Sequence, residues 1–343
     1  LPRPTGLFLA AFGLGCNYGP GAGAKPRRSD MTQTTHTPQA FMTADQLRQR
    51  GRLAMWVHGA RLYSLVITLA PILVGVGYAY GETGRLAIWP VLAATLSALA
   101  IQIATNLAND AADGVSGVDS LQRPGPPRLT GSGLMSAGQV RAGAMVMTAI
   151  AGGFGLVAVM AGGVPILAIG IASVLAGWAY SFGPRPISAT AWGEVFVVLF
   201  FGVLAVAGTA WLAARVAGWT PLLLGLAIGL PAGAVLTVNN HRDRVQDYQS
   251  GRRTLAIRIG PQATVWLYGA QMIGASLIAA LAIAPVTPVG AGIVALTMPA
   301  GGWLTHRVAT TPISLDQSRR LAETAKAQML LALLLAIVLV WRP

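Results

Sequence analysis

Long apolar runs separated by short polar segments extend along the chain from residue 62 to residue 341. A helix rises about 1.5 Å per residue, so a helix that crosses the hydrocarbon core of a membrane needs about 20 apolar residues. Lipid offers the backbone no hydrogen-bond partners, and a helix satisfies these groups internally. The pattern predicts an all-α, polytopic membrane protein with nine transmembrane helices, over residues 62–80, 86–108, 144–163, 164–182, 193–212, 221–240, 263–284, 287–304 and 326–341.

Two boundaries in this pattern depend on turn-forming residues. Gly162, Gly163 and Pro165 separate the third run from the fourth, and Pro285 and Pro288 separate the seventh from the eighth. Glycine and proline are the strongest local interruptions of a helix. Each pair of runs is therefore predicted as two helices joined by a tight turn.

The composition excludes a water-soluble fold. Hydrophobic residues make up 54% of the 343 residues, charged residues only 10%, and the mean hydropathy is +0.60. A soluble domain carries about 25% charged residues, which cover its water-facing surface. The single cysteine, Cys16, also excludes a disulfide framework and a cysteine-based metal site.

The net charge of +13 would suggest nucleic-acid binding in a soluble protein, but here it indicates membrane topology. If the N-terminus is cytoplasmic and loops alternate, seventeen Lys and Arg fall inside and three outside, with four more in the first 30 residues. Positive residues concentrate in cytoplasmic loops. The split supports nine helices with the N-terminus inside, and no nucleic-acid partner is expected.

Residues 1–61 differ from the rest of the chain. Residues 1–40 are expected to be a disordered or non-native extension, with Met31 as the hypothetical natural start. Residues 41–61 place Leu47 and Leu53 among arginines such as Arg48, a pattern typical of an amphipathic helix at the membrane interface. Residues 62–341 are predicted to form a single transmembrane domain.

The acidic residues are few and clustered. Of the eleven, five lie at the cytoplasmic ends of helices two and six or in the loops that follow, namely Asp110, Asp113, Asp119, Asp243 and Asp247. Acids at the membrane edge are costly and indicate function by default. Polar neighbours share one helical face with them, because Asn106, Asn109, Asp110 and Asp113 are spaced i, i+3, i+4, i+7, and Asn239, Asn240, Asp243 and Asp247 are spaced i, i+1, i+4, i+8.

Two acidic helix ends that face each other require a cation between them, since the carboxylates would otherwise repel. Mg²⁺ takes oxygen ligands and is commonly held by one or two carboxylates plus substrate phosphates. Arginine-rich loops nearby suit phosphate recognition. Carboxylates, Mg²⁺ and arginines together predict a diphosphate site at the membrane surface.

Simpler interpretations exist for some of these residues. Acids beside arginines could be solvated interfacial ion pairs, although two matched motifs in a chain with few other acids favour a site. His241 lies off the face of its motif, which favours a hydrogen-bonded or solvated role. Glu194 opens helix five, where capping is as consistent with its position as catalysis.

The two motifs resemble the aspartate-rich N-D-x-x-D and D-x-x-x-D motifs of the UbiA superfamily of intramembrane prenyltransferases. The loop sequences are most similar to the branch that prenylates 1,4-dihydroxy-2-naphthoate. The stretches that carry the resemblance are 106–119, 123–134, 179–186 and 239–260. They differ from the family pattern in having Arg252 where lysine is common and Leu62 where proline usually follows the arginine.

The resemblance implies a prenyltransferase of menaquinone biosynthesis in a prokaryotic cytoplasmic (inner) membrane. Its substrates would be a polyprenyl diphosphate and 1,4-dihydroxy-2-naphthoate, and its cofactor Mg²⁺, with two ions expected. The implied catalytic and metal-binding residues are Asp110, Asp113, Asp243 and Asp247. The implied substrate-binding residues are Asn106, Asn109, Arg123, Arg128, Asn239, Arg252, Arg253, Tyr180 and Arg185, the last two toward the acceptor ring and its carboxylate.

Two alternatives stay open at this point. One is a related prenyltransferase that uses 4-hydroxybenzoate, homogentisate or a chlorophyll-like ring as the acceptor. The other is a secondary transporter, since apolar helices alone are compatible with transport. Transporters place ionisable groups near the bilayer midplane, whereas the acids here gather at one face, which favours the enzyme.

Overall fold

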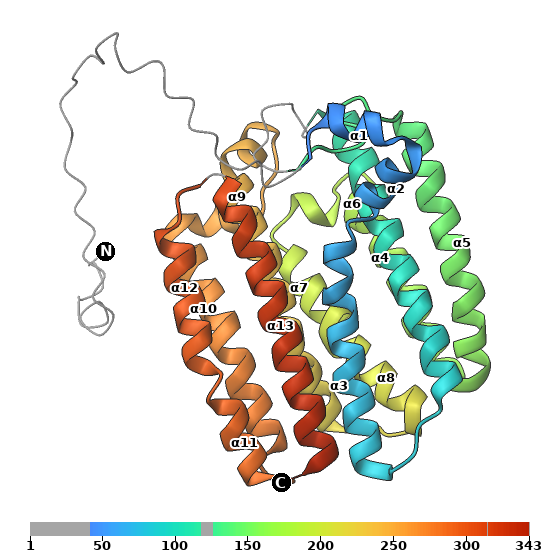
Figure 1. The fold of residues 1–343 in the computed structure, drawn as a ribbon, viewed down its shortest axis with the longest axis vertical. Coiled ribbons are helices and arrows are strands. Elements are labelled where there is room, and N and C mark those ends of the chain that lie inside the picture. Colours follow the sequence, from blue (N-terminus) through green and yellow to red (C-terminus); the bar gives the residue numbers. More distant parts are fainter. Residues whose placement is uncertain (1–41, 118–125, 314, 343) are drawn as a thin grey trace, which may run out of the picture. The chain divides into compact units, whose positions relative to one another are not determined.

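The computed structural model describes residues 42–117, 126–313 and 315–342, apart from the side chains of residues 315 and 316. Throughout these ranges the regular structure is helical (Figure 1). The α-helices are α1 (Ala44–Arg50), α2 (Arg52–Ala60), α3 (Leu65–Thr83), α4 (Ile88–Ser116), α5 (Ala137–Gly162), α6 (Val164–Ser181), α7 (Gly193–Val198), α8 (Leu204–Ala214), α9 (Trp219–Gln249), α10 (Leu255–Ile283), α11 (Pro288–Ala295), α12 (Met298–Thr310) and α13 (Leu315–Trp341).

The segment expected to be amphipathic is helical and is divided into α1 and α2 at Gly51. Thr43 caps α1 through a reciprocal pair of hydrogen bonds with Gln46. Gly51 ends α1 with a φ of 84°, a conformation that glycine adopts without strain. Leu47 is buried while Leu53 is 77% exposed, so one face of this segment packs on the protein. Its place at a membrane interface stays a prediction, and residues 1–40 lie outside the described part of the chain.

Eight helical segments among the described residues are long and apolar enough to cross a membrane. They account for every expected run except 287–304. That run forms two shorter helices, α11 and α12, which follow one another in Figure 1. Pro299, in the first turn of α12, has no backbone N–H with which to continue α11. The eighth expected crossing is therefore broken.

Two helices continue well beyond their expected ends. Helix α4 runs to Ser116 and α9 to Gln249, because the polar residues that lower the hydropathy there are compatible with a helix. Helix α4 stops at Gly117, which has a φ of 73°, and the chain beyond α9 turns at Gly251, with a φ of 82°. Both acidic motifs consequently lie on regular helix, which fixes the direction of each side chain.

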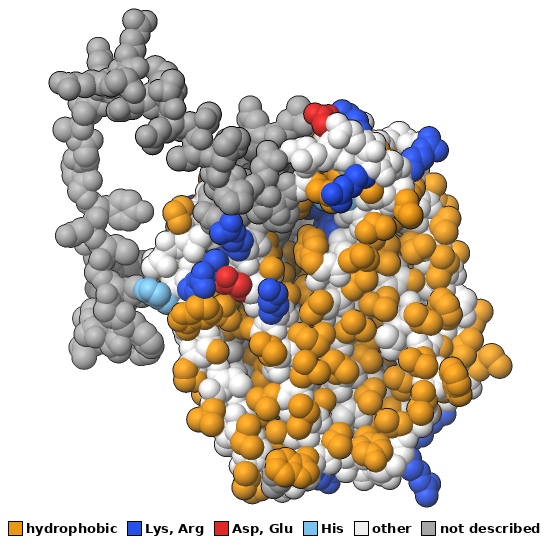
Figure 2. All heavy atoms as spheres, viewed as in Figure 1, with side chains coloured by type: hydrophobic (Ala, Val, Ile, Leu, Met, Phe, Trp, Pro, Cys, Tyr) orange, Lys and Arg blue, Asp and Glu red, His pale blue; other side chains and the backbone are white. Residues whose placement is uncertain are grey.

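The surface is that of a multi-pass membrane protein. Figure 2 shows one face covered largely by hydrophobic side chains, with lysine and arginine concentrated toward its ends. Large apolar side chains such as Leu156, Met160 and Leu175 are 63%, 87% and 65% exposed. An apolar surface of this extent is stable in lipid and marks an interaction region in water.

Three glycines allow α9 to approach the segment between α7 and α8 closely. The chain between α7 and α8 forms a π-helical turn, Leu199–Val203, which contains Gly202. A Cβ atom on Gly202 would lie 2.4 Å from the carbonyl oxygen of Gly225, and one on Gly229 would lie 2.6 Å from that of Val198. Small residues permit such contacts in membranes. The glycines therefore fix α9 against the π turn.

We expect Gly229→Ala to lower the thermal stability of the detergent-solubilised protein. The added methyl group meets backbone atoms that cannot rotate away, and overpacking of this kind costs about 1–3 kcal/mol. Gly292→Ala is the control, because its Cβ would meet no atom within 4 Å. A melting temperature for Gly229→Ala equal to that of the control variant would contradict this account.

Candidate active site

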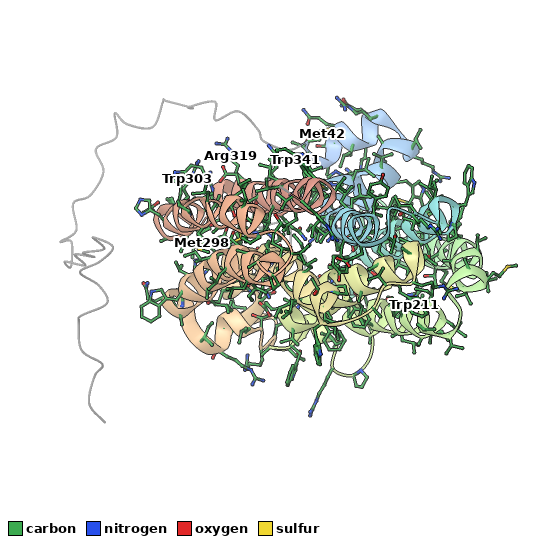
Figure 3. The ribbon with its side chains drawn as sticks, turned by 90° about the horizontal axis from the view of Figure 1, so that it is seen from below. Met42, Trp211, Met298, Trp303, Arg319 and Trp341 are labelled. Carbon is green, nitrogen blue, oxygen red and sulfur yellow. The ribbon has the colours of Figure 1, made fainter. Side chains whose placement is uncertain are left out.

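A cavity of about 940 Å³ lies inside the helical bundle. Residues of α3, α4, α5, α6, α7, α8, α9 and α13 line it. Figure 3 looks along the helices from the end opposite the acidic motifs and shows the helical segments that surround this region. At the motif end the lining is polar and includes Asp113, Asp243 and Asp247, whereas Val91 and Leu212 line it near the opposite helix ends.

The acidic side chains at the polar end are almost fully buried. Asp113, Asp243 and Asp247 are 7%, 5% and 3% exposed. A buried carboxylate is costly unless it is paired or hydrogen-bonded. The cavity wall must therefore supply positive charge close to each of them.

Arg252 lies between the two motifs and contacts both. Its guanidinium donates to Asp113 Oδ1 on α4 and, from Nη1 at 3.3 Å, to Asp247 Oδ1 on α9. The residues lie in three separate segments, and the chain beyond α9 turns back at Gly251 to deliver Arg252. A cation thus bridges the two acidic helix ends, as the sequence pattern requires. The bridging cation in this structure is a side chain.

Asp243 has an arginine of its own. Arg242 Nε lies 2.6 Å from Asp243 Oδ1, and Arg242 Nη2 lies 2.7 Å from Oδ2. Arg242 also donates to Asn239 Oδ1 and to Ser318 Oγ at the start of α13. This bidentate pairing fixes the orientation of the Asp243 carboxylate. Arg242 could not be singled out from the sequence, since an arginine beside an acid also serves the positive-inside bias.

Asp110 faces a loop and does not line the cavity as the described residues define it. Its Oδ2 accepts from the backbone N–H of Leu129 at 2.9 Å, and its Oδ1 from that of Thr130 at 2.8 Å. The side chain is 1% exposed. In this position the carboxylate holds the loop that carries Arg128, a cavity residue, whereas the sequence pattern led us to expect it at a metal ion.

The same loop is held from α2 and α4. His58 Nε2 lies 2.8 Å from the carbonyl oxygen of Pro127. Leu129 is fully buried in the core beside α2 and α4, and Gly114 leaves room for Thr130, whose Cγ2 would lie 2.3 Å from an added Cβ. Arg128 is therefore presented by a loop with fixed contacts on three sides.

The remaining expected site residues divide into two groups. Those that line the cavity are Asn109, Asn239 and Tyr180. Those that do not are Asn106, which donates to the carbonyl of Ala60 and to Ser64 Oγ, and Arg185 and Arg253, which are exposed. Arg123 lies outside the described residues.

Several cavity features were missed by sequence reasoning. Arg61, which follows α2 directly, lines the wall, and Ser318 and Arg319 line it from α13. Asn240, another lining residue, donates to Glu194 Oε1 at 2.9 Å, which makes Glu194 a buried partner of the second motif. The only available signal was their position at the motif-bearing ends of helices.

The polar end fits a hard divalent cation held partly by its substrate. Among the described residues no three Asp, Glu, His or Cys side chains form a ready-made metal cage. The lining offers carboxylates in small numbers with amide oxygens from Asn109 and Asn239. Mg²⁺ is usually bound by one or two carboxylates together with phosphate oxygens and water. Arg252 already places positive charge between Asp113 and Asp247.

We expect Asp110→Asn to loosen the loop around Arg128. An asparagine side chain has one acceptor oxygen and turns an N–H donor toward the second loop amide. A hydrogen bond to a charged group contributes about 1.5–3 kcal/mol, so the Leu129 and Thr130 amides should exchange about tenfold faster or more. Hydrogen–deuterium exchange of this loop measures the effect, with Asp113→Asn as the matched control. Unchanged protection in Asp110→Asn would refute the anchoring role.

Comparison with known proteins identifies the family. The model of the UbiA prenyltransferase family matches residues 68–332. The chain is 33% identical to the 1,4-dihydroxy-2-naphthoate octaprenyltransferase of Mycobacterium leprae over 71% of this chain and 82% of that protein. It is 34% identical to the enzyme of the same name from Escherichia coli, over 62% and 71% of the two chains.

Solved structures share the fold at low sequence identity. A UbiA homolog from Archaeoglobus fulgidus bound to DMAPP and Mg²⁺ aligns with a TM-score of 0.61 at 15% identity, over 83% of this chain and 99% of that one. The same homolog bound to GPP and Mg²⁺ aligns with a TM-score of 0.61 at 16% identity. With the family match spanning most of the described helices, the chain belongs to the UbiA prenyltransferase family.

Proposed function

We propose that this protein transfers a polyprenyl group from a polyprenyl diphosphate to 1,4-dihydroxy-2-naphthoate. The products are demethylmenaquinol, CO₂ and diphosphate, in the biosynthesis of menaquinone. The observation that carries the proposal is a single cavity with acids and arginines at one end and an apolar arm along the helices. The naphthoate prenyltransferases among its relatives support the choice of acceptor.

The polar end suits the diphosphate of the donor. Arg128 and Arg252 line it, and guanidinium groups bind phosphate oxygens in pairs. Arg252 is held by Asp113 and Asp247 in this structure, so donor binding would exchange part of this pairing for phosphate contacts. Negative charge that grows on the leaving diphosphate is then met by groups already in position.

Asp113, Asp243 and Asp247, with Asn109 and Asn239, would hold Mg²⁺, with two ions expected. When bound, Mg²⁺ neutralises the diphosphate and makes it a better leaving group. Asp110 is left out of this set, because both of its oxygens accept hydrogen bonds from the loop. Its contribution to catalysis is then the position of Arg128.

The reaction is a substitution on an electron-rich ring. The carbon–oxygen bond of the donor breaks, and its electron pair leaves with the diphosphate. A pair of ring electrons forms the new carbon–carbon bond, and loss of CO₂ returns a pair that restores aromaticity. Tyr180, which lines the cavity, would stack against the ring. The mainly apolar lining of the cavity would limit the access of water that could otherwise capture the allylic cation.

The expected orientation puts the polar end at the cytoplasmic face of a prokaryotic cytoplasmic membrane, with the N-terminus inside. The diphosphate and naphthoate then enter from the side on which soluble metabolites occur. The isoprenoid tail lies along the apolar arm, parallel to the lipid chains. The uneven distribution of lysine and arginine along the sequence supports this orientation.

A product assay tests the proposal directly. Purified protein with Mg²⁺, 1,4-dihydroxy-2-naphthoate and a polyprenyl diphosphate should release CO₂ and yield the prenylated quinol. Asp113→Ala and Asp247→Ala should lower turnover by at least about a hundredfold, since each removes one partner of a buried charge network. EDTA should abolish turnover, and added Mg²⁺ should restore it.

Asp45→Ala is the control for these variants, because its side chain is 81% exposed and remote from the motifs in sequence. Turnover of Asp113→Ala or Asp247→Ala within a few-fold of this control would contradict the site. Transfer to 4-hydroxybenzoate but not to the naphthoate would overturn the acceptor and leave prenyl transfer intact.

The apolar arm should limit the length of the donor tail. Gly152 and Gly153 are neighbours on α5, and a Cβ on either would meet no atom within 4 Å, but only Gly152 lines the cavity. Gly152→Phe should therefore shift the preference toward shorter prenyl diphosphates, while Gly153→Phe should not. Competition between donors of different length, resolved by mass spectrometry of the products, measures the shift. An equal response of the two variants would contradict the assignment of the arm.

A further inference from the structure

Three residues other than glycine have a positive φ among the described residues, and all three are arginines. They are Arg61, Arg215 and Arg342, with φ of 52°, 60° and 44°. The left-handed conformation costs an ordinary residue about 1–2 kcal/mol, and glycine is the usual choice. Each arginine must therefore provide something that glycine would not.

Two of the three have a visible structural role. Arg215 donates from Nη1 to the carbonyl of Gly162 at 3.0 Å, and its guanidinium lies 5.0 Å from the centre of the Trp211 ring. Arg342 Nη2 lies 2.5 Å from Glu82 Oε1. Their side chains hold together helix ends at the end of the bundle opposite the motifs, which offsets the backbone cost.

Arg61 makes no such contact with the described residues. It lines the cavity, and its Nη2 atom is shielded from solvent without a hydrogen-bond partner among them. The described residues also offer it no ion pair within 4 Å, unlike Arg242 and Arg252. A shielded guanidinium nitrogen without an acceptor is costly, which indicates that a ligand completes it.

The backbone around Arg61 is fixed by neighbouring helices. The backbone N–H and the hydroxyl of Ser64 both donate to the Arg61 carbonyl, at 2.7 and 2.8 Å. Asn106 on α4 donates to the carbonyl of Ala60 at 3.0 Å and to Ser64 Oγ at 2.9 Å. This explains the placement of Asn106 outside the cavity lining. The turn is thus rigid, and the guanidinium it carries is positioned before any ligand arrives.

A second incomplete polar group lies beside the same turn. Gln102 lines the cavity and donates through Nε2 to Ser64 Oγ at 3.3 Å. Its Oε1 atom is shielded and has no hydrogen-bond partner within the described chain. Arg61 and Gln102 thus both extend into the cavity from positions beside Ser64, one with a guanidinium nitrogen that requires an acceptor and the other with an amide oxygen that requires a donor. A hydroxy-substituted aromatic acid carries both groups on adjacent ring positions.

The residues that carry this pair are anchored deeper in the bundle than the acids that Arg252 bridges. Asn106, which holds the Arg61 turn, precedes Asp113 by seven residues on α4, about 10 Å along the helix axis. Asn106, and with it the turn at Arg61, therefore lies on the apolar side of the acids that Arg252 bridges. The bond to be formed joins the first carbon of the tail to the acceptor ring, so the ring would lie next to the diphosphate on its apolar side.

We infer that Arg61 binds the carboxylate of the aromatic acceptor and that Gln102 accepts a hydrogen bond from the adjacent ring hydroxyl. The inference rests on the proposed function and assigns the acceptor site within it. Arg185, expected from the sequence to pair with this carboxylate, is exposed and does not line the cavity as the described residues define it. Arg61 is then a residue that determines which acceptors are used.

Arg61→Gly tests the inference without endangering the fold. Glycine relieves the positive φ, so the variant should melt at the same temperature as the wild type or higher. The probes are 1-hydroxy-2-naphthoate and 1-naphthol, whose binding to the detergent-purified protein is measured by calorimetry. We expect the acid to bind about 10- to 100-fold more weakly to Arg61→Gly, the range for a charge-assisted hydrogen bond, and 1-naphthol to bind as before.

Arg215→Gly is the matched control, since it removes an arginine of the same backbone conformation at the other end of the bundle. It should leave the affinity for both probes unchanged. Equal losses for acid and naphthol in Arg61→Gly, with a lower melting temperature, would assign Arg61 a structural role and overturn the inference. An unchanged affinity for the acid would overturn it as well.

The proposed function is judged separately by prenyl transfer in the wild-type protein. Suppose that the wild type prenylates the naphthoate and that Arg61→Gly binds the acid, relative to 1-naphthol, as tightly as the wild type does. Then only the assignment of the acceptor site is wrong. If the wild type transfers no prenyl group to any naphthoate, the proposed function fails, whatever the two probes show.

Discussion

The pairing of buried carboxylates with arginines is the constraint on which the rest of this structure depends. Asp113 and Asp247 lie on different helices, nearly shielded from solvent, and Arg252 contacts both. Without positive charge between them, α4 and α9 could not bring their acidic ends to one cavity. The same charges then suit a diphosphate and its metal ion. The interaction that holds the helix ends together is also the one that substrate binding must rearrange.

Helix positions and the acidic ends were predictable from sequence, because apolar length and spacing determine them directly. The prediction that all four polar residues of the first motif share one face did not distinguish the two directions in which they point. Asn109 and Asp113 form one i, i+4 strip that lines the cavity, while Asn106 and Asp110 form a second strip that contacts the α2 side and the loop. Adjacent residues differ by about 100° around a helix. Spacing alone cannot say which strip faces the cavity, since that depends on how the helices pack.

Residues delivered by turns were the least predictable part of the site. Arg61 reaches the cavity because its backbone adopts the left-handed conformation, which turns the chain between α2 and α3. Arg128 reaches it because contacts of His58, Asp110 and Leu129 hold its loop in place. Neither arrangement leaves a periodic pattern in the sequence. The broken crossing of α11 and α12 was missed for a related reason, because hydropathy measures apolar length and is insensitive to a missing backbone N–H at Pro299.

The bridge through Arg252 also bears on how the protein is made. Asp113 and Arg252 are 139 residues apart in the chain. During synthesis, the acidic end of α4 is complete long before Arg252 leaves the ribosome. Until then Asp113 lacks its contact with Arg252, and the acidic ends of α4 and α9 are not yet joined. The bundle can close around its cavity only after α9 and the turn beyond it have entered, so assembly of the active centre belongs to the late stages of biogenesis.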